Sequence, residues 1–116
     1  MAKLKTIGKT KILYVMATDA EFGENLQKCF EPLMCGVGPV EAALNTALAL
    51  TEFSPNLIVS LGSAGSAVLE QTGIYQASSV AYRDMDASAF GFKKGETPFL
   101  GLPATIEVSN RVPSLP

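Results

Sequence analysis

Glu21 is a candidate for acid–base chemistry in a chain that contains no histidine. Without that residue type, such chemistry must fall to Asp, Glu, Lys, Tyr or Cys. Glu21 follows an apolar run at residues 12–17, where its carboxylate could polarise a water molecule. Thr18-Asp19-Ala20-Glu21 also fits a capping box, in which the Glu21 carboxylate would accept a hydrogen bond from the Thr18 N–H. Because capping boxes are common, the pattern by itself favours the capping role.

A turn of small residues, Gly62-Ser63-Ala64-Gly65-Ser66, is a second candidate. It follows an apolar run, and its lack of side-chain bulk would let backbone N–H groups and hydroxyls approach a flat ligand or an anion. The same composition suits a tight turn from a strand into a helix. The sequence leaves both interpretations open.

Gly36-Val37-Gly38 precedes a helical pattern and partly matches the dinucleotide-binding fingerprint. The third glycine position of that fingerprint holds Glu41, however, and the preceding strand signal is weak. No glycine-rich loop is followed by Gly-Lys-Ser or Gly-Lys-Thr, the signature of a phosphate-binding loop. We therefore expect a tight turn that leads into a helix.

The segment that begins with Arg83-Asp84-Met85-Asp86 combines a charged turn with aromatic residues. The two carboxylates lack a third metal ligand nearby, so we expect a solvated turn or an ion pair with Arg83. Four apolar residues follow in a segment without a regular pattern: Phe90, Phe92, Phe99 and Leu100. They could form a flap over the core of this chain, or contact a ligand or a second subunit.

These residues are positioned by alternating strand and helix patterns, which predict an α/β sandwich with a largely parallel sheet. Pro39 suits the first turn of a helix that ends at Ser54-Pro55, and a capped helix should run from Thr18 to Pro32. Strands are predicted at residues 12–16, 33–35, 57–61, 78–82 and 104–108. Ligands bind such sheets at the carboxyl ends of the strands. Three loops should lie there, at residues 18–21, at residues 62–66 and after Tyr82.

Composition restricts the partners. Nine Lys and Arg against eleven Asp and Glu give a net charge of −2, so we expect no nucleic-acid partner. No stretch approaches the roughly 18 apolar residues of a membrane span. Cys29 and Cys35 give neither a disulfide framework nor a zinc pattern. We expect both thiols to be reduced and packed, in a cytoplasmic protein that uses no metal and no cofactor.

Four stretches in this order resemble the purine nucleoside phosphorylase and nucleosidase superfamily, and most closely the 5'-methylthioadenosine/S-adenosylhomocysteine nucleosidases. They are Ala17-Thr18-Asp19-Ala20-Glu21 and residues 36–44, 55–65 and 82–92. The resemblance implies a three-layer α/β sandwich with a mixed, largely parallel central sheet. It also implies that residues 1–116 form the N-terminal half of one such domain. The last residues look like a connector, which agrees with an apparently truncated chain.

The resemblance implies that Glu21 holds the water that attacks the N-ribosidic bond of a nucleoside, with release of adenine. It places Thr18, Val37, Ser63, Ala64 and Gly65 in the nucleoside pocket. Three further residues would close the pocket of the neighbouring subunit in a homodimer: Phe90, Phe92 and Pro98. In this family the C-terminal half supplies the glutamate that binds the ribose and the aspartate that protonates the purine. A phosphorylase and a nucleoside-binding module without activity are the alternatives.

Overall fold

The computed structural model describes residues 2–116. The chain divides into two compact units, of which the first ends at Gly65 and the second is Ser66–Pro116. Each unit has its own sheet. The carboxylate and the small-residue turn singled out in the sequence both lie in the first unit, and the aromatic segment lies in the second.

The sheet of the first unit is built around β2 (Thr10–Met16). β1 (Lys5–Ile7) pairs with it antiparallel, whereas β3 (Leu33–Met34) and β4 (Leu57–Ser60) pair with it parallel. Ile12 pairs with Lys5 on one side and with Leu57 on the other. Therefore β4 follows one edge of β2, while β1 and β3 share the opposite edge. The predicted mixed, largely parallel sheet is confirmed.

Helix α2 (Pro39–Phe53) covers one face of this sheet. Its Ala49 packs in the buried core with Leu13 and Val15 of β2. The predicted bounds are confirmed: Pro39 lies in the first turn, and Ser54 ends the helix in a left-handed conformation with φ 46°. Gly38 precedes the helix at φ 93°, which confirms the tight turn and explains its glycine. Within residues 2–116 no helix has the length and apolar character needed to cross a membrane.

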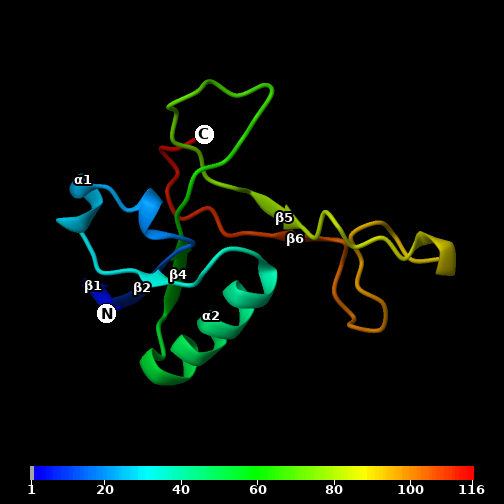
Figure 1. The fold of residues 1–116 in the computed structure, drawn as a ribbon, viewed down its shortest axis with the longest axis horizontal. Helices are drawn as coiled ribbons and strands as arrows, with labels where there is room; N and C mark the ends of the chain where they lie inside the picture. Colours follow the sequence, from blue (N-terminus) through cyan, green and yellow to red (C-terminus); the bar gives the residue numbers. More distant parts are fainter. Residues whose placement is uncertain (1) are drawn as a thin grey trace. The chain divides into compact units, whose positions relative to one another are not determined.

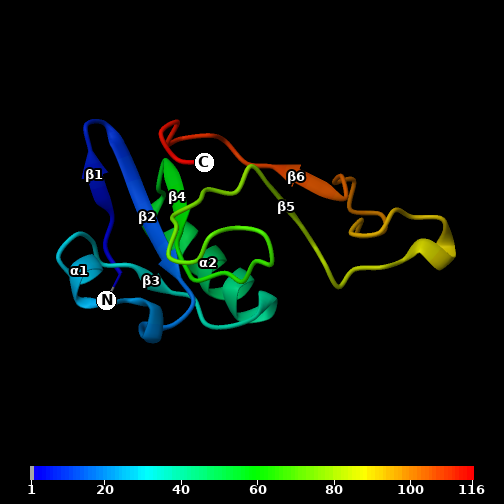
Figure 2. The same ribbon diagram turned by 90° about the horizontal axis from the view of Figure 1, so that it is seen from above.

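Aromatic residues cover the other face of the sheet. Alternate residues of a strand point to opposite faces, so Tyr14 points away from the side of Leu13. The Tyr14 ring stacks on Phe30 with centroids 4.1 Å apart. Phe30 follows the short helix α1 (Glu24–Gln27), and both ribbon views place α1 and α2 on opposite sides of β2 (Figures 1 and 2). The first unit therefore has the layered α/β arrangement that was predicted.

The helix predicted from Thr18 to Pro32 is wrong. The structure has a 3-10 turn, η1 (Asp19–Glu21), and then the separate helix α1. Gly23 separates η1 from α1, because its backbone is extended, with φ −72° and ψ 167°. β1 was not predicted either, because its lysines mask the strand pattern; it forms a hairpin with β2 through Gly8 at φ 60°.

The second unit is built on a two-stranded antiparallel ribbon of β5 (Ser79–Ala81) and β6 (Thr105–Glu107) (Figure 1). Both strands were predicted. The segment between them holds the short 3-10 turn η2 (Ser88–Phe90). The predicted ion pair of the charged turn is confirmed, with Arg83 and Asp84 3.0 Å apart and both side chains exposed.

The two cysteines have different environments. Both thiols are free, and Cys35 is buried in the core of the first unit. Cys29 is exposed. The expectation that both thiols are packed is therefore wrong for Cys29, because the helix predicted around it is replaced by the short α1 and an irregular segment.

Candidate active site

Glu21 lies directly after β2, in the 3-10 turn η1. Thr18 caps this turn: its Oγ1 accepts from the Ala20 N–H at 3.4 Å. The Glu21 N–H donates to the Thr18 carbonyl at 3.1 Å. Thr18 is therefore a cap, as predicted, but the reciprocal bond of a capping box is not formed. The Glu21 side chain is directed to another part of the unit.

The partner of the Glu21 carboxylate is Ser63, in the small-residue turn after β4. The Ser63 N–H donates to Glu21 Oε1 at 2.9 Å, and the Ser63 hydroxyl donates to the same oxygen at 2.6 Å. β2 and β4 are parallel neighbours, and the Leu61 N–H continues their ladder by donating to the Val15 carbonyl at 2.9 Å. Parallel pairing brings the carboxyl ends of both strands together, so residues 42 positions apart in sequence meet.

The second carboxylate oxygen has a different environment. Glu21 Oε2 is buried and has no hydrogen-bond partner within residues 2–116. Buried polar atoms in native structures nearly always have a partner, and an unpaired one calls for an explanation. Ser63 thus holds one oxygen of Glu21, while the other is shielded from solvent, and the Ala17 N–H also contributes to lowering the pKa of the carboxyl.

The two hydrogen bonds from Ser63 also set the charge of Glu21. The bond from the Ser63 hydroxyl, followed by the bond from its N–H, lowers the pKa of the Glu21 carboxyl below its usual range. Hydrogen bonds donated to a carboxylate stabilise its ionised form. Glu21 is therefore an anion at neutral pH, ready to accept a proton or a hydrogen bond.

Gly62 contributes space to the site, although it was predicted only as part of the small-residue turn and not as a pocket residue. A Cβ at this position would lie 3.3 Å from both Oε1 and Oε2 of Glu21. The backbone at Gly62 thus passes close to the carboxylate. The run of small residues in the turn was the signal that could have indicated this close approach.

The other residues predicted for the nucleoside pocket lie in the same unit or in the second unit. Val37 lies in the loop before α2 with 75% of its surface exposed. Ala64 and Gly65 are exposed in the turn that holds Ser63. Of the residues around the candidate site, the hydrogen bonds join Glu21 to Ser63, and the backbone of Gly62 passes close to the same carboxylate.

The aromatic residues lie in the second unit, where they do not form a buried core. Phe90 is 83% exposed and Phe99 is 96% exposed. Phe92 packs edge-on against Phe99 with ring centroids 5.5 Å apart, and Pro98 is half-buried. In the charged turn nearby, Asp86 accepts a hydrogen bond from the Ser88 N–H at 3.0 Å. Within the described residues, no three Asp, Glu, Cys or His side chains are grouped so as to hold a metal ion.

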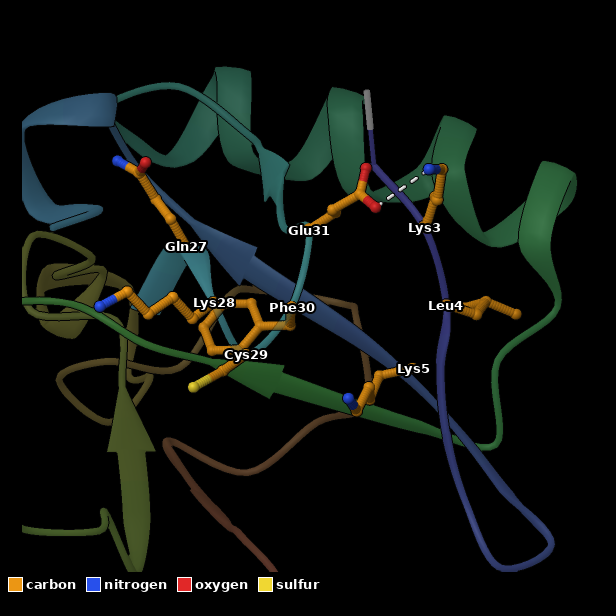
Figure 3. A pocket seen from close by; sticks show the side chains of 8 residues that line it. All are labelled: Lys3, Leu4, Lys5, Gln27, Lys28, Cys29, Phe30 and Glu31. Carbon is orange, nitrogen blue, oxygen red and sulfur yellow. Dashed lines mark hydrogen bonds and ion pairs between the residues drawn. The ribbon is translucent and has the colours of Figure 1, made fainter. Parts of the chain in front are cut away.

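A hollow of about 240 Å³ lies elsewhere in the first unit (Figure 3). Its lining residues are Lys3, Leu4, Lys5, Gln27, Lys28, Cys29, Phe30 and Glu31. Lys3 pairs with Glu31 at 3.0 Å. Gln27 donates to the Phe22 carbonyl at 2.9 Å, and the Cys29 thiol donates to a backbone carbonyl at 3.4 Å. These groups bind neighbouring protein atoms, and none of them belongs to the Glu21 site.

Comparison with protein families gives one match of wide extent. The family described as the phosphorylase superfamily matches residues 32–114. The match includes β4, the turn that holds Ser63 and all but the last two residues of the second unit, and it begins after Glu21.

Curated relatives match over much of the chain. A 5'-methylthioadenosine/S-adenosylhomocysteine nucleosidase from Actinobacillus succinogenes is 35% identical over 95 residues, which is 80% of this chain and 40% of the relative. A protein of the same name from Staphylococcus haemolyticus is 41% identical over 69 residues, 58% of this chain and 30% of the relative. The chain therefore spans well under half the length of these relatives.

A solved structure has the same fold. The crystal structure of 5'-methylthioadenosine/S-adenosylhomocysteine nucleosidase from Neisseria meningitidis, in complex with methylthio-immucillin-A, aligns with a TM-score of 0.71 at 24% identity. The alignment covers 84% of this chain and 52% of that one. This likeness confirms the predicted fold class. The relatives and the solved structure are of the kind that the four sequence stretches predicted.

Proposed function

This chain belongs to the phosphorylase superfamily, and from that membership we propose that the intact protein is a nucleosidase. It hydrolyses the N-ribosidic bond of 5'-methylthioadenosine or S-adenosylhomocysteine and releases adenine. Residues 1–116 form the N-terminal half of its single α/β domain. The names of the curated relatives support this substrate class. The observation that carries the proposal is the Glu21 carboxylate, held by two hydrogen bonds from Ser63 where the parallel strands β2 and β4 end.

The reaction defines what Glu21 must do. The bond between the anomeric carbon and N9 of adenine breaks, and its electron pair leaves with the purine. Positive charge develops on the sugar, and a water oxygen forms the new bond to the anomeric carbon. One proton of that water passes to a base, and the purine receives a proton from a general acid. Glu21 is the base, and in the resemblance the proton donor to the purine belongs to the C-terminal half.

The geometry of Glu21 suits this role. Its ionised carboxylate would stabilise positive charge on the sugar and accept a hydrogen bond from the attacking water. Ser63 holds this carboxylate in place through Oε1. The lowered pKa of Glu21 keeps the carboxylate ionised at neutral pH, where such a base must be unprotonated to act.

The remaining pocket residues are part of the same proposal. Thr18, Val37, Ala64 and Gly65 line the nucleoside pocket together with Ser63. The exposure of Val37 and of the turn after β4 supports their contact with a ligand.

The intact protein acts as a homodimer, in which the aromatic segment closes the pocket of the neighbouring subunit. Phe90, Phe92 and Pro98 contribute to this closure. The high exposure of Phe90 in this chain supports a contact outside it.

Glu21→Gln in the intact protein tests the proposal. The amide keeps the shape of the side chain but cannot accept a proton, so adenine release from 5'-methylthioadenosine should fall about 10³-fold, within the range for loss of a general base. Glu24→Gln is the matched control: Glu24 is an exposed carboxylate three residues further along the chain, and its replacement should leave turnover unchanged. Unchanged turnover in Glu21→Gln would refute the assignment.

The same assay separates the alternatives. A nucleosidase releases adenine in buffer without phosphate, whereas a phosphorylase requires phosphate as the nucleophile. Adenosine binding without any release would indicate a binding module. We expect adenine release at an equal rate with and without phosphate, measured on the intact protein.

A further inference from the structure

We propose that Ser63 is a positioning residue that holds the Glu21 carboxylate in one orientation. The inference rests on the proposed function and deepens it. Position 63 was predicted only as part of the nucleoside pocket lining, and its contacts give it a more specific task.

The geometry shows how Ser63 fixes the carboxylate. Both of its donors, the N–H at 2.9 Å and the hydroxyl at 2.6 Å, converge on Oε1. No hydrogen bond from residues 2–116 reaches the buried Oε2. A carboxylate held through one oxygen by two donors of one residue cannot exchange its oxygens without losing both bonds. Ser63 thus holds the carboxylate in one orientation, which is how pre-organised groups accelerate a reaction.

The hydroxyl of Ser63 has a further consequence for ligand recognition. A serine hydroxyl carries one proton to donate and two lone pairs that accept. Its proton is already donated to Glu21 Oε1, so toward a nucleoside the hydroxyl can only accept. Ser63 can therefore contact a ribose hydroxyl or an amino group, and it cannot donate to a ring nitrogen without releasing Glu21.

The hydrogen bonds also couple position and charge. The hydroxyl of Ser63 is the largest cause of the lowered pKa of Glu21, and the Ser63 N–H is the second. Alanine at position 63 would remove the first and keep the second. The pKa of Glu21 should then rise toward its ordinary value, while the carboxylate gains freedom to rotate.

Ser63→Ala and Ser63→Thr in the intact protein test the proposal. For Ser63→Ala we expect kcat to fall roughly tenfold, the loss of one hydrogen bond to a charged group, with a smaller change in KM. The acidic limb of the pH profile of kcat should move to higher pH. Threonine retains the hydroxyl, so Ser63→Thr should restore both. Ser60→Ala, at an exposed position at the end of β4, is the matched control and should behave as wild type.

A different pattern would overturn the inference. If Ser63 acts through the nucleoside alone, Ser63→Ala will raise KM while kcat and the acidic limb stay unchanged. The double variant Glu21→Gln with Ser63→Ala gives a second criterion, because a residue that acts through Glu21 adds no loss once Glu21 is disabled. A further full tenfold loss in the double variant would contradict the proposal.

The two proposals can fail separately. If Glu21→Gln is inactive and Ser63→Ala equals wild type in kcat and in its pH profile, the nucleosidase function stands and the role of Ser63 is refuted. If Glu21→Gln keeps full turnover, the proposed function itself is refuted.

Discussion

Gly62→Ala should displace the Glu21 carboxylate and lower kcat without unfolding the protein. The new Cβ would lie 3.3 Å from both carboxylate oxygens, closer than the ordinary contact by about a few tenths of an ångström. The Glu21 carboxylate cannot move away freely, because the Ser63 hydroxyl at 2.6 Å and the Ser63 N–H at 2.9 Å both bind its Oε1. Any displacement therefore stretches those bonds or tilts the carboxylate out of its orientation.

The magnitude follows from that displacement. A misplacement of about 1 Å in a reacting group can cost about 10²-fold in rate. A shift of a few tenths of an ångström is a fraction of that error, so kcat for adenine release should fall severalfold. The free energy of unfolding should change little. The φ of Gly62 lies outside the left-handed region, so alanine can adopt the backbone conformation of this position. Such a Gly→Ala substitution gains about 0.4–1 kcal/mol through the unfolded state, which offsets part of the strain.

The assay measures kcat and KM for 5'-methylthioadenosine together with urea denaturation of the same intact protein. Gly23→Ala is the matched control, because Gly23 lies two residues from Glu21 and a Cβ there would meet nothing within 4 Å. We expect normal kcat in Gly23→Ala and a reduced kcat in Gly62→Ala, with similar unfolding midpoints. Full kcat in Gly62→Ala, or an equal loss in both variants, would refute the reasoning.

Three further predictions concern stability and the aromatic segment. Because the pKa of Glu21 is lowered in the folded state, its ionised carboxylate stabilises the fold at pH values above its ordinary pKa of 4.5, and this stabilisation is lost as the pH falls through the lower folded pKa. The unfolding free energies of wild type and Glu21→Gln in urea should therefore differ at neutral pH, and the difference should shrink in acid. Leu13→Ala should cost about 3 kcal/mol of unfolding free energy, because Leu13 is fully buried. Val40→Ala, at a 76% exposed position, should stay within about 0.5 kcal/mol in the same urea measurement. Phe90→Ala should leave stability equally unchanged but raise the KM for 5'-methylthioadenosine severalfold, and an unchanged KM would contradict its role in closing the neighbouring pocket.

The sequence predicts those elements whose boundaries are marked by local chemistry. Apolar runs between polar residues identify β2 and β4, and Pro39 with Ser54 marks both ends of α2. β1 was missed because its lysines hide the strand pattern, although hydrogen bonds to β2 hold it in the sheet. The helix expected after Thr18 was wrong because Gly23 takes an extended backbone there.

The candidate site shows the limit of local patterns. Residues 18–21 fit a capping box, and Thr18 does cap the turn. The position and hydrogen bonding of the Glu21 carboxylate, however, depend on Ser63, which lies 42 residues away in the sequence. Only the parallel pairing of β2 with β4 brings the two together. The resemblance to a family indicated the importance of Glu21, while the two bonds to Oε1 and the close approach of Gly62 required the structure.

A crystal structure of the intact protein with a non-hydrolysable analogue of 5'-methylthioadenosine would test the central claim most directly. We predict an ordered water about 2.6–3.2 Å from a carboxylate oxygen of Glu21, directed at the anomeric carbon, with Ser63 still bound to Oε1. A nucleoside bound away from the turn after β4, or a Glu21 carboxylate directed away from the sugar, would contradict it.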